Sequence, residues 1–120
     1  MRIVERRKQT RLPLHWVVYL SSGFSGEIET NTVNLGVGGF YCILPTAFTV
    51  GEVFKCDIAL PAYGRGSSQR TLHGRGEVVR VETRGNEAGF GVAFRFMELC
   101  LQGLRDQTCL IGSVKRTVML

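Results

Sequence analysis

The chain of 120 residues carries 15 lysines and arginines against 10 aspartates and glutamates, which gives a net charge of +5 at pH 7. This length fits one domain with a modest core, and 44% hydrophobic residues exclude a disordered or fibrous chain. No apolar run approaches the roughly 20 residues of a membrane span. The charged start Met1-Arg2-Ile3 also lacks the apolar region of a signal peptide. We therefore expect a soluble cytoplasmic protein with no membrane span.

Six segments read as β-strands, because they are rich in β-branched and aromatic residues or alternate in polarity. The clearest is 53–60, whose even-numbered residues are apolar while Lys55 and Asp57 take the other face. Two glycines, Gly74 and Gly76, indicate a bulge or a bend in the fifth segment. A turn over 84–87 closes the last hairpin. The predicted strands are 14–20, 27–34, 40–44, 53–60, 71–82 and 89–96.

The sixth segment has small residues at 89, 91 and 93 on one face. The room that they leave suits close packing, a neighbouring strand or a ligand, and close packing is the favoured interpretation.

From Met97 the spacing of the apolar residues changes, and a stripe at helical spacing continues over about four turns. We therefore predict a C-terminal helix, and additional apolar residues would widen its face enough for a weak homodimer. The stripe is Met97, Leu101, Leu104, Thr108 and Ile111, and the additional residues are Leu99, Cys100 and Leu110.

Six strands with turns every 8–12 residues or so are typical of an all-β barrel or sandwich. The predicted fold is thus mainly all-β, with six antiparallel strands followed by a C-terminal α-helix. It divides the chain into a basic N-terminal arm (1–12), a β-barrel (13–96), and a helix with a tail (97–120).

The sequence completes no catalytic or metal-binding pattern. The segment 23–26 lacks the final glycine of a nucleophile elbow, and Tyr41 stands where a dinucleotide-binding loop needs glycine. His15 and His73 each lie in a strand, and no pair of carboxylates stands out, so we do not expect an enzyme. The cysteines have neither CxxC spacing nor histidine partners for zinc. Cys42 and Cys56 lie in apolar strands as small buried side chains, and we expect all four cysteines to be thiols.

Two unusual stretches remain. Between two predicted strands, Asn34 precedes glycines at 36, 38 and 39, a cluster that needs either positive φ or the close approach of another group to the backbone. Far earlier in the chain, Glu5-Arg6-Arg7-Lys8-Gln9-Thr10-Arg11 has four cations in its last six residues. Arginine offers a planar fork that fits phosphate and the guanine edge. Together the two stretches suggest a clamp for a phosphorylated nucleotide.

At these residues the chain resembles a known family. Arg7-x-x-x-Arg11 followed by Asn34-x-Gly36-x-x-Gly39 is similar to the RxxxR and (D/N)xSxxG pair of the PilZ domain, a bacterial receptor for cyclic di-GMP. The resemblance runs from about residue 5 through 96, and it implies a barrel of PilZ type. One departure is that Gly36 stands where the family has serine, so a hydroxyl group is missing.

The resemblance also implies roles for seven residues. The arm would fold over cyclic di-GMP, with Arg7 and Arg11 on phosphate and guanine edges and Arg6 stacking or reaching phosphate. Asn34 would bond a guanine edge or fix the turn, and the glycines would admit the ligand. No cofactor is expected. The predicted ligand-binding residues are Arg6, Arg7, Arg11, Asn34, Gly36, Gly38 and Gly39.

The leading hypothesis is a receptor and adaptor module. Its arm is mobile until cyclic di-GMP orders it, and that ordering changes contacts with an unidentified effector protein. One alternative is a PilZ-like interaction module that has lost its ligand. The other is a β-barrel for single-stranded nucleic acid, which draws on the basic charge and on aromatic residues, but nucleic acid is not the expected partner. Those aromatic residues are Trp16, Tyr19, Phe40 and Tyr41.

Overall fold

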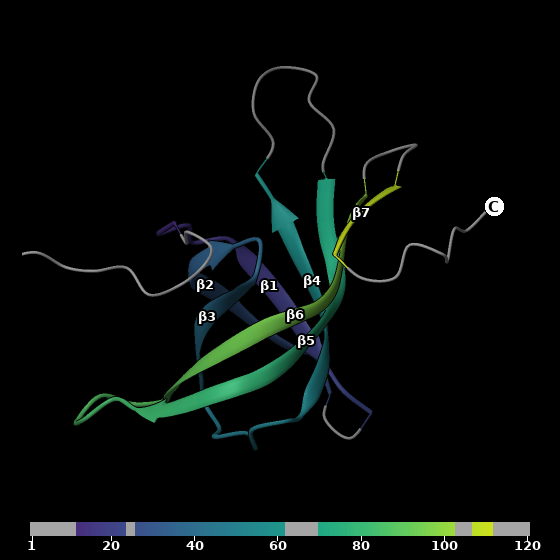
Figure 1. The fold of residues 1–120 in the computed structure, drawn as a ribbon. Helices are drawn as coiled ribbons and strands as arrows, with labels where there is room; N and C mark the ends of the chain where they lie inside the picture. The colour runs from purple at the N-terminus through teal and green to yellow at the C-terminus, as the bar shows by residue number, and fades with distance from the viewer. Residues whose placement is uncertain (1–11, 24–25, 62–69, 103–106, 112–120) are drawn as a thin grey trace, which may run out of the picture.

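The computed structural model describes residues 12–23, 26–61, 70–102 and 107–111. In these ranges every regular element is a β-strand, and neighbouring strands run antiparallel (Figure 1). The strands are β1 (Val17–Ser21), β2 (Ile28–Gly36), β3 (Gly39–Leu44), β4 (Val53–Leu60), β5 (Arg70–Thr83), β6 (Phe90–Gln102) and β7 (Gln107–Ile111).

Six of these strands close into a barrel. The sheet order is β3-β2-β1-β4-β5-β6-β7, and a further pairing between β3 and β6 closes the ring. β7 pairs with the end of β6 outside the ring. The prediction of a six-stranded antiparallel barrel is confirmed.

The barrel interior is filled by apolar side chains from all six of its strands. Phe94 stacks on Phe40 with ring centroids 4.8 Å apart, and it meets Phe54 edge-on at 5.8 Å. Cys42 and Cys56 are fully buried among them. Burial raises the pKa of both thiols to about 12. The interpretation of these two cysteines as small core residues is confirmed.

A β-bulge explains why the C-terminal residues resembled a helix. The pairing of β5 with β6 shifts register between Arg75 and Gly76, which leaves Met97 as an extra residue on β6. Phe96 and Leu99 therefore both point into the barrel, although they stand three positions apart. Spacing of three is typical of a helix, whereas a regular strand repeats every two residues.

The predicted helix over 97–120 is wrong in the residues that the structure describes. Residues 97–102 continue β6 and 107–111 form β7, while 103–106 and 112–120 lie outside the described residues. The 14-residue β5 offers a long edge of hydrogen-bonding groups, and pairing with it outweighs the helical spacing. Leu99 is 2% exposed inside the barrel, so it is unavailable for the apolar helix face behind the predicted homodimer.

The room beside the small residues of β6 is filled by a tyrosine from β3. A Cβ added at Gly91 would lie 1.7 Å from the hydroxyl oxygen of Tyr41, so the tyrosine ring crosses the bare glycine. That hydroxyl donates to Glu82 at 2.9 Å, and the Arg80 guanidinium lies 6.0 Å from the ring centroid. Burial, together with the bond to Glu82, raises the pKa of Tyr41. Close packing, the favoured interpretation of this face, is confirmed.

Candidate functional site

The described chain begins beside the glycine-rich turn. The Leu12 amide donates to the Leu35 carbonyl at 2.9 Å, and the Leu35 amide donates to the Leu12 carbonyl at 2.9 Å. This isolated antiparallel bridge places Leu12 opposite the residue between Asn34 and Gly36. The residue that follows Arg11 in the sequence is therefore fixed at the Asn34–Gly39 motif.

A buried threonine holds the rest of the 12–16 segment against β2. The Thr32 hydroxyl accepts a bond from the Trp16 amide at 3.0 Å and donates to the Leu14 carbonyl at 2.5 Å. The Thr32 amide donates to the Trp16 carbonyl at 2.9 Å, and exposed His15 donates from Nδ1 to the Thr32 carbonyl at 3.2 Å. Thr32 is 1% exposed. The sequence alone does not reveal this role, because a threonine in a polar strand looks solvent-facing.

Replacing Thr32 by valine is expected to destabilise the domain by about 1–3 kcal/mol, because it leaves the partly buried Trp16 amide and Leu14 carbonyl without their partner. Chemical denaturation measures this loss. Thr30→Val is the matched control, since its hydroxyl donates a single bond, to the Ile43 carbonyl at 3.0 Å. A Thr32→Val variant no less stable than the control would contradict the role assigned to the hydroxyl.

Asn34 follows a bulge in β2. The register of β2 on β3 shifts between Thr32 and Asn34, so Val33 is the extra residue, and Thr32 and Leu35 both face the core. The bulge thus takes the side chains of Val33 and Asn34 out of the regular inward and outward alternation of the strand. The Asn34 Oδ1 is buried and has no hydrogen-bond partner among the described residues. A buried acceptor without a partner calls for an explanation, and a ligand donor is one.

The glycines of the turn have a structural role of their own. Gly36 pairs with Gly39 at the end of the β2–β3 hairpin, and the Gly38 carbonyl accepts a bond from the Phe96 amide at 2.9 Å. A Cβ at Gly39 would lie 2.0 Å from the Phe94 carbonyl oxygen. Positive φ occurs among the described residues only at other glycines, so close approach explains Gly39. The approaching group is the backbone of β6, at the seam that closes the barrel.

The structure thus brings Asn34, Gly36, Gly38 and Gly39 together with the chain that leads from the arm. Arg6, Arg7 and Arg11 lie outside the described residues. Within the described ranges, no group of three or more His, Cys, Asp and Glu side chains is placed to hold a metal ion. Those ranges also contain no helix long and apolar enough to span a membrane.

The comparison with protein families decides the identity of this barrel. The family model of the PilZ domain matches residues 5–107, a range that contains the three arginines Arg6, Arg7 and Arg11 and the Asn34–Gly39 motif. The chain belongs to the PilZ domain family. Comparison with curated proteins gave no match.

Solved structures share the fold of this PilZ domain. The inhibitor of motility (MotI/DgrA) of Bacillus subtilis superposes with a TM-score of 0.68 at 21% identity, covering 80% of this chain and 44% of that one. The PilZ domain of Escherichia coli YcgR with c-di-GMP gives 0.58 at 17% identity, covering 78% and 79%. YcgR in complex with c-di-GMP gives 0.57 at 17% identity, and the chain spans 38% of its length.

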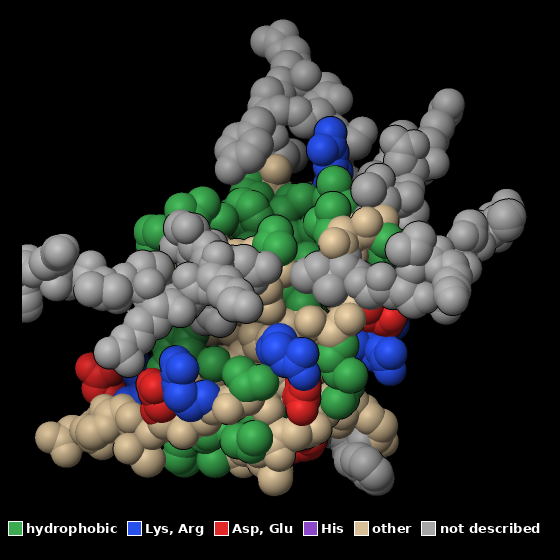
Figure 2. Space-filling view, viewed as in Figure 1, with side chains coloured by type: hydrophobic (Ala, Val, Ile, Leu, Met, Phe, Trp, Pro, Cys, Tyr) green, Lys and Arg blue, Asp and Glu red, His purple; other side chains and the backbone are tan. Residues whose placement is uncertain are grey.

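Four arginines on or beside β5 and β6 of this PilZ domain are paired with carboxylates. Figure 2 shows blue and red side chains beside one another on the lower part of the molecule. The arginine nitrogen atoms lie 2.6–2.9 Å from glutamate oxygen atoms in three of these pairs. Neighbouring carboxylates therefore balance the charges of these arginines at the protein surface. The ion pairs are Arg75–Glu98, Arg80–Glu82, Arg84–Glu87 and Arg95–Glu77.

The aromatic residues that suggested nucleic-acid binding are not displayed together. Phe40 is fully buried between Phe94 and Phe96, so it cannot stack on a base. Tyr41 lies across Gly91 and is bonded to Glu82. The structure therefore removes Phe40 from the aromatic residues on which that alternative depended, and it engages Tyr41 in contacts within the protein.

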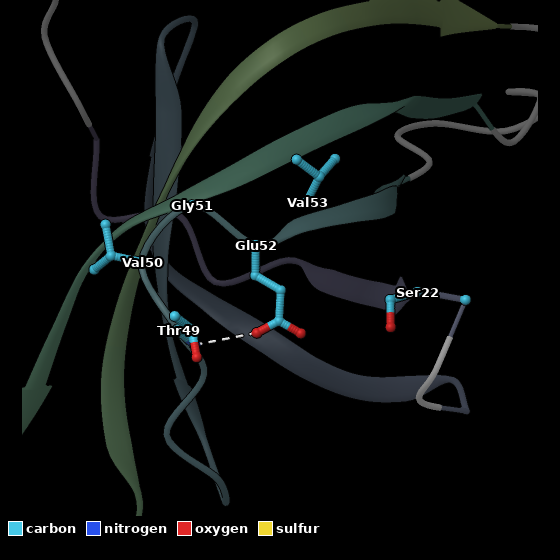
Figure 3. A pocket seen from close by; sticks show the side chains of 7 residues that line it. Ser22, Thr49, Val50, Gly51, Glu52 and Val53 are labelled. Atoms are coloured by element: carbon cyan, nitrogen blue, oxygen red, sulfur yellow. Dashed lines mark hydrogen bonds between the residues drawn. The ribbon is translucent and has the colours of Figure 1, made fainter.

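A pocket of about 600 Å³ lies at the other end of the barrel, between the end of β1 and the loop before β4. In Figure 3 the Glu52 side chain points into it, and the Glu52 carboxylate accepts a bond from the Thr49 amide at 3.1 Å. β1 pairs with β2 from Ile28 onward at this end, seven residues before Leu35. At about 3.3 Å per residue, the pocket is some 20 Å from the motif. It is lined by Ser22, Gly23, Thr49, Val50, Gly51, Glu52 and Val53.

Proposed function

We propose that this PilZ domain is a cytoplasmic receptor for cyclic di-GMP, which binds where the 12–16 segment meets the Asn34–Gly39 motif. The observation that carries the proposal is the bridge between Leu12 and Leu35, with both hydrogen bonds at 2.9 Å. It joins the residue that follows the RxxxR stretch in the sequence to the residue between Asn34 and Gly36 in the second motif. The YcgR PilZ domain solved with c-di-GMP has the same fold, and it supports the choice of ligand.

The arm is short enough that its arginines stay near the bridge. Arg11 directly precedes Leu12, and Arg7 stands five residues before it, which limits the distance from Leu12 to about 18 Å even for an extended chain. A guanidinium group can donate two parallel bonds to a phosphate or to the O6 and N7 atoms of guanine. Arg7 and Arg11 take these contacts in our proposal, and Arg6 stacks on a base or reaches phosphate.

The described residues of the motif supply complementary groups. The buried Oδ1 of Asn34, which has no partner in the described part of the chain, accepts a bond from a guanine N–H group. Gly36 and Gly38 present backbone without a side chain, so the ligand can approach closely. Gly39 serves the seam between β3 and β6 and contributes to the site by shaping the turn.

Ligand binding would act as a signal through the arm. An unliganded arm carries repelling cations and little to bury, so ordering it requires the compensating charge of the ligand phosphates. The ordered arm presents a new surface to an effector protein, which makes the domain an adaptor and not an enzyme. Isothermal titration calorimetry with cyclic di-GMP tests the proposal. Stoichiometric binding is expected, and absence of both heat and thermal stabilisation would refute it.

A PilZ domain without ligand is the second candidate, and Gly36 is the observation that favours it. The family serine would supply a hydroxyl, and glycine supplies none. Gly36 is not among the glycines with positive φ, so a side chain can be introduced there without backbone strain. Such a domain would bind its partner protein directly and give no heat with the nucleotide.

Gly36→Ser is expected to tighten cyclic di-GMP binding by about 2- to 10-fold, because one added hydrogen bond contributes about 0.5–1.5 kcal/mol. Calorimetry on both proteins measures the change. Gly26→Ser is the control, since a Cβ at Gly26 meets nothing within 4 Å. Unchanged affinity in Gly36→Ser would show that the missing hydroxyl is not a ligand contact in this domain.

A further inference from the structure

Two cysteines face each other across β6 and β7. Cys100 pairs directly with Cys109 in the register of the two strands, and their Sγ atoms are 2.9 Å apart. Directly opposed residues of antiparallel strands have Cα atoms about 4.5–5.5 Å apart. That separation falls within the range that a disulfide bond requires. The two thiols could therefore be joined with little movement of the backbone.

This pair differs from the other two cysteines of the chain in its access to solvent. Cys109 is exposed and Cys100 is half-buried, whereas Cys42 and Cys56 are fully buried in the barrel. Burial raises the pKa of Cys42 and of Cys56 to about 12, which suppresses their thiolate forms. A dissolved oxidant can thus reach the pair on β6 and β7 while the core thiols remain protected.

Polar residues on the neighbouring strands lie in the same row as this pair. The register places Tyr19, Asp57, His73 and Cys100 side by side on four successive strands, and Cys109 follows on β7. The Nε2 of His73 is buried and has no hydrogen-bond partner among the described residues. Cys100 therefore lies beside an imidazole on β5, a setting that differs from the apolar surroundings of the core thiols.

We propose that Cys100 and Cys109 form a reversible disulfide by exchange with a low-molecular-weight disulfide such as glutathione disulfide. The exposed Cys109 thiolate attacks one sulfur of glutathione disulfide and releases one glutathione thiolate, which leaves a mixed disulfide on Cys109. The Cys100 thiolate then attacks the Cys109 sulfur and releases the second glutathione. Two protein thiols and one glutathione disulfide are converted into one protein disulfide and two glutathiones. Excess dithiol reductant reverses the reaction.

The bond would control how firmly β7 is held. β7 is described only in its pairing with β6, and Figure 1 shows it on the side of the barrel away from β2 and β3. A covalent link at Cys100 and Cys109 closes the β6–β7 hairpin and keeps β7 paired when its hydrogen bonds open. The switch is thus separate from the proposed nucleotide site, and neither proposal depends on the other.

The site is tested by equilibrating the native protein in glutathione buffers of increasing oxidising strength, followed by acid quenching and mass spectrometry. The expected product is a monomer that has lost two hydrogen atoms, with one peptide pair linked through Cys100 and Cys109. Persistence of four thiols, or a disulfide that involves Cys42 or Cys56, would overturn the proposal. A disulfide that forms only between two chains would overturn it as well.

Single serine variants sharpen the test, because serine nearly matches cysteine in size and these positions are not in the core. In Cys100→Ser the remaining Cys109 is expected to hold one glutathione as a stable mixed disulfide, since no second thiol can displace it. In the wild-type protein that adduct should be transient. Amide hydrogen exchange at 107–111 is expected to slow by about tenfold or more on oxidation. Equal exchange in the two redox states would overturn the proposed control of β7.

Discussion

Arg7→Ala and Arg11→Ala are each expected to weaken cyclic di-GMP binding by about 10- to 100-fold in titration calorimetry. A hydrogen bond to a charged group contributes about 1.5–3 kcal/mol, and each guanidinium would make a bidentate contact with phosphate or guanine. Arg11 directly precedes Leu12, which is fixed at the motif by two bonds of 2.9 Å. Neither change removes a contact within the barrel that the structure describes, so the unfolding transition of the unliganded protein should be nearly unchanged.

Two control variants separate specific contacts from general charge. Lys55→Ala removes one positive charge from an exposed position on β4 and should leave the affinity within about twofold. Arg11→Lys keeps the charge but loses the planar fork, so it should lose most of the affinity that Arg11→Ala loses. Wild-type affinity in both alanine variants would contradict the proposed site. A loss of affinity in Lys55→Ala equal to that in Arg11→Ala would show that the arm attracts the ligand only through its general positive charge.

Gly39→Ala is expected to be strongly destabilising. The added Cβ would lie 2.0 Å from the Phe94 carbonyl oxygen, 3.0 Å from the Phe94 carbonyl carbon and 3.1 Å from the Arg95 Cα. All three atoms belong to the backbone of β6, which pairs with β3 and cannot rotate aside as a side chain would. We expect a loss of about 3 kcal/mol or more, with a fall in Tm of about 10 °C or more.

Thermal denaturation of Gly39→Ala beside Gly26→Ala measures this effect. Both glycines lack positive φ, but a Cβ at Gly26 meets nothing within 4 Å, so the control should keep its Tm within about 2 °C. A Gly39→Ala protein as stable as the control would show that β3 and β6 are not closed as described. Reduced ligand binding in Gly39→Ala would not by itself assign Gly39 to the ligand.

The sequence predicted the barrel because most of its strands alternate regularly between apolar and polar residues. Within Val53–Leu60, for example, Phe54, Cys56 and Ile58 are buried as that alternation requires. The prediction was wrong where a bulge interrupts the alternation. Met97, which the predicted helix placed on its apolar stripe, is 39% exposed, whereas Leu99, which lay off that stripe, is 2% exposed. A bulge depends on the partner strand, so a single sequence read segment by segment does not reveal it.

The candidate site was also predictable only in part. The spacing of the two motifs indicated that they belong together, and the Leu12–Leu35 bridge agrees with this. Thr32 was missed, because its importance comes from two backbone groups 16 and 18 residues earlier in the chain. Gly39 was assigned to the ligand, whereas its neighbour is the Phe94 backbone on a strand more than 50 residues away. Partners this distant in sequence become visible only once the barrel is closed.

The position of Trp16 makes it an intrinsic fluorescence probe. It is the single tryptophan of the chain, its indole packs in part against the core, and its amide is bound to the Thr32 hydroxyl. Intrinsic tryptophan fluorescence therefore originates from the one stretch that links the arm to β2. Its emission maximum and quenching report the environment of that stretch in the whole, unlabelled protein, without a contribution from any other indole.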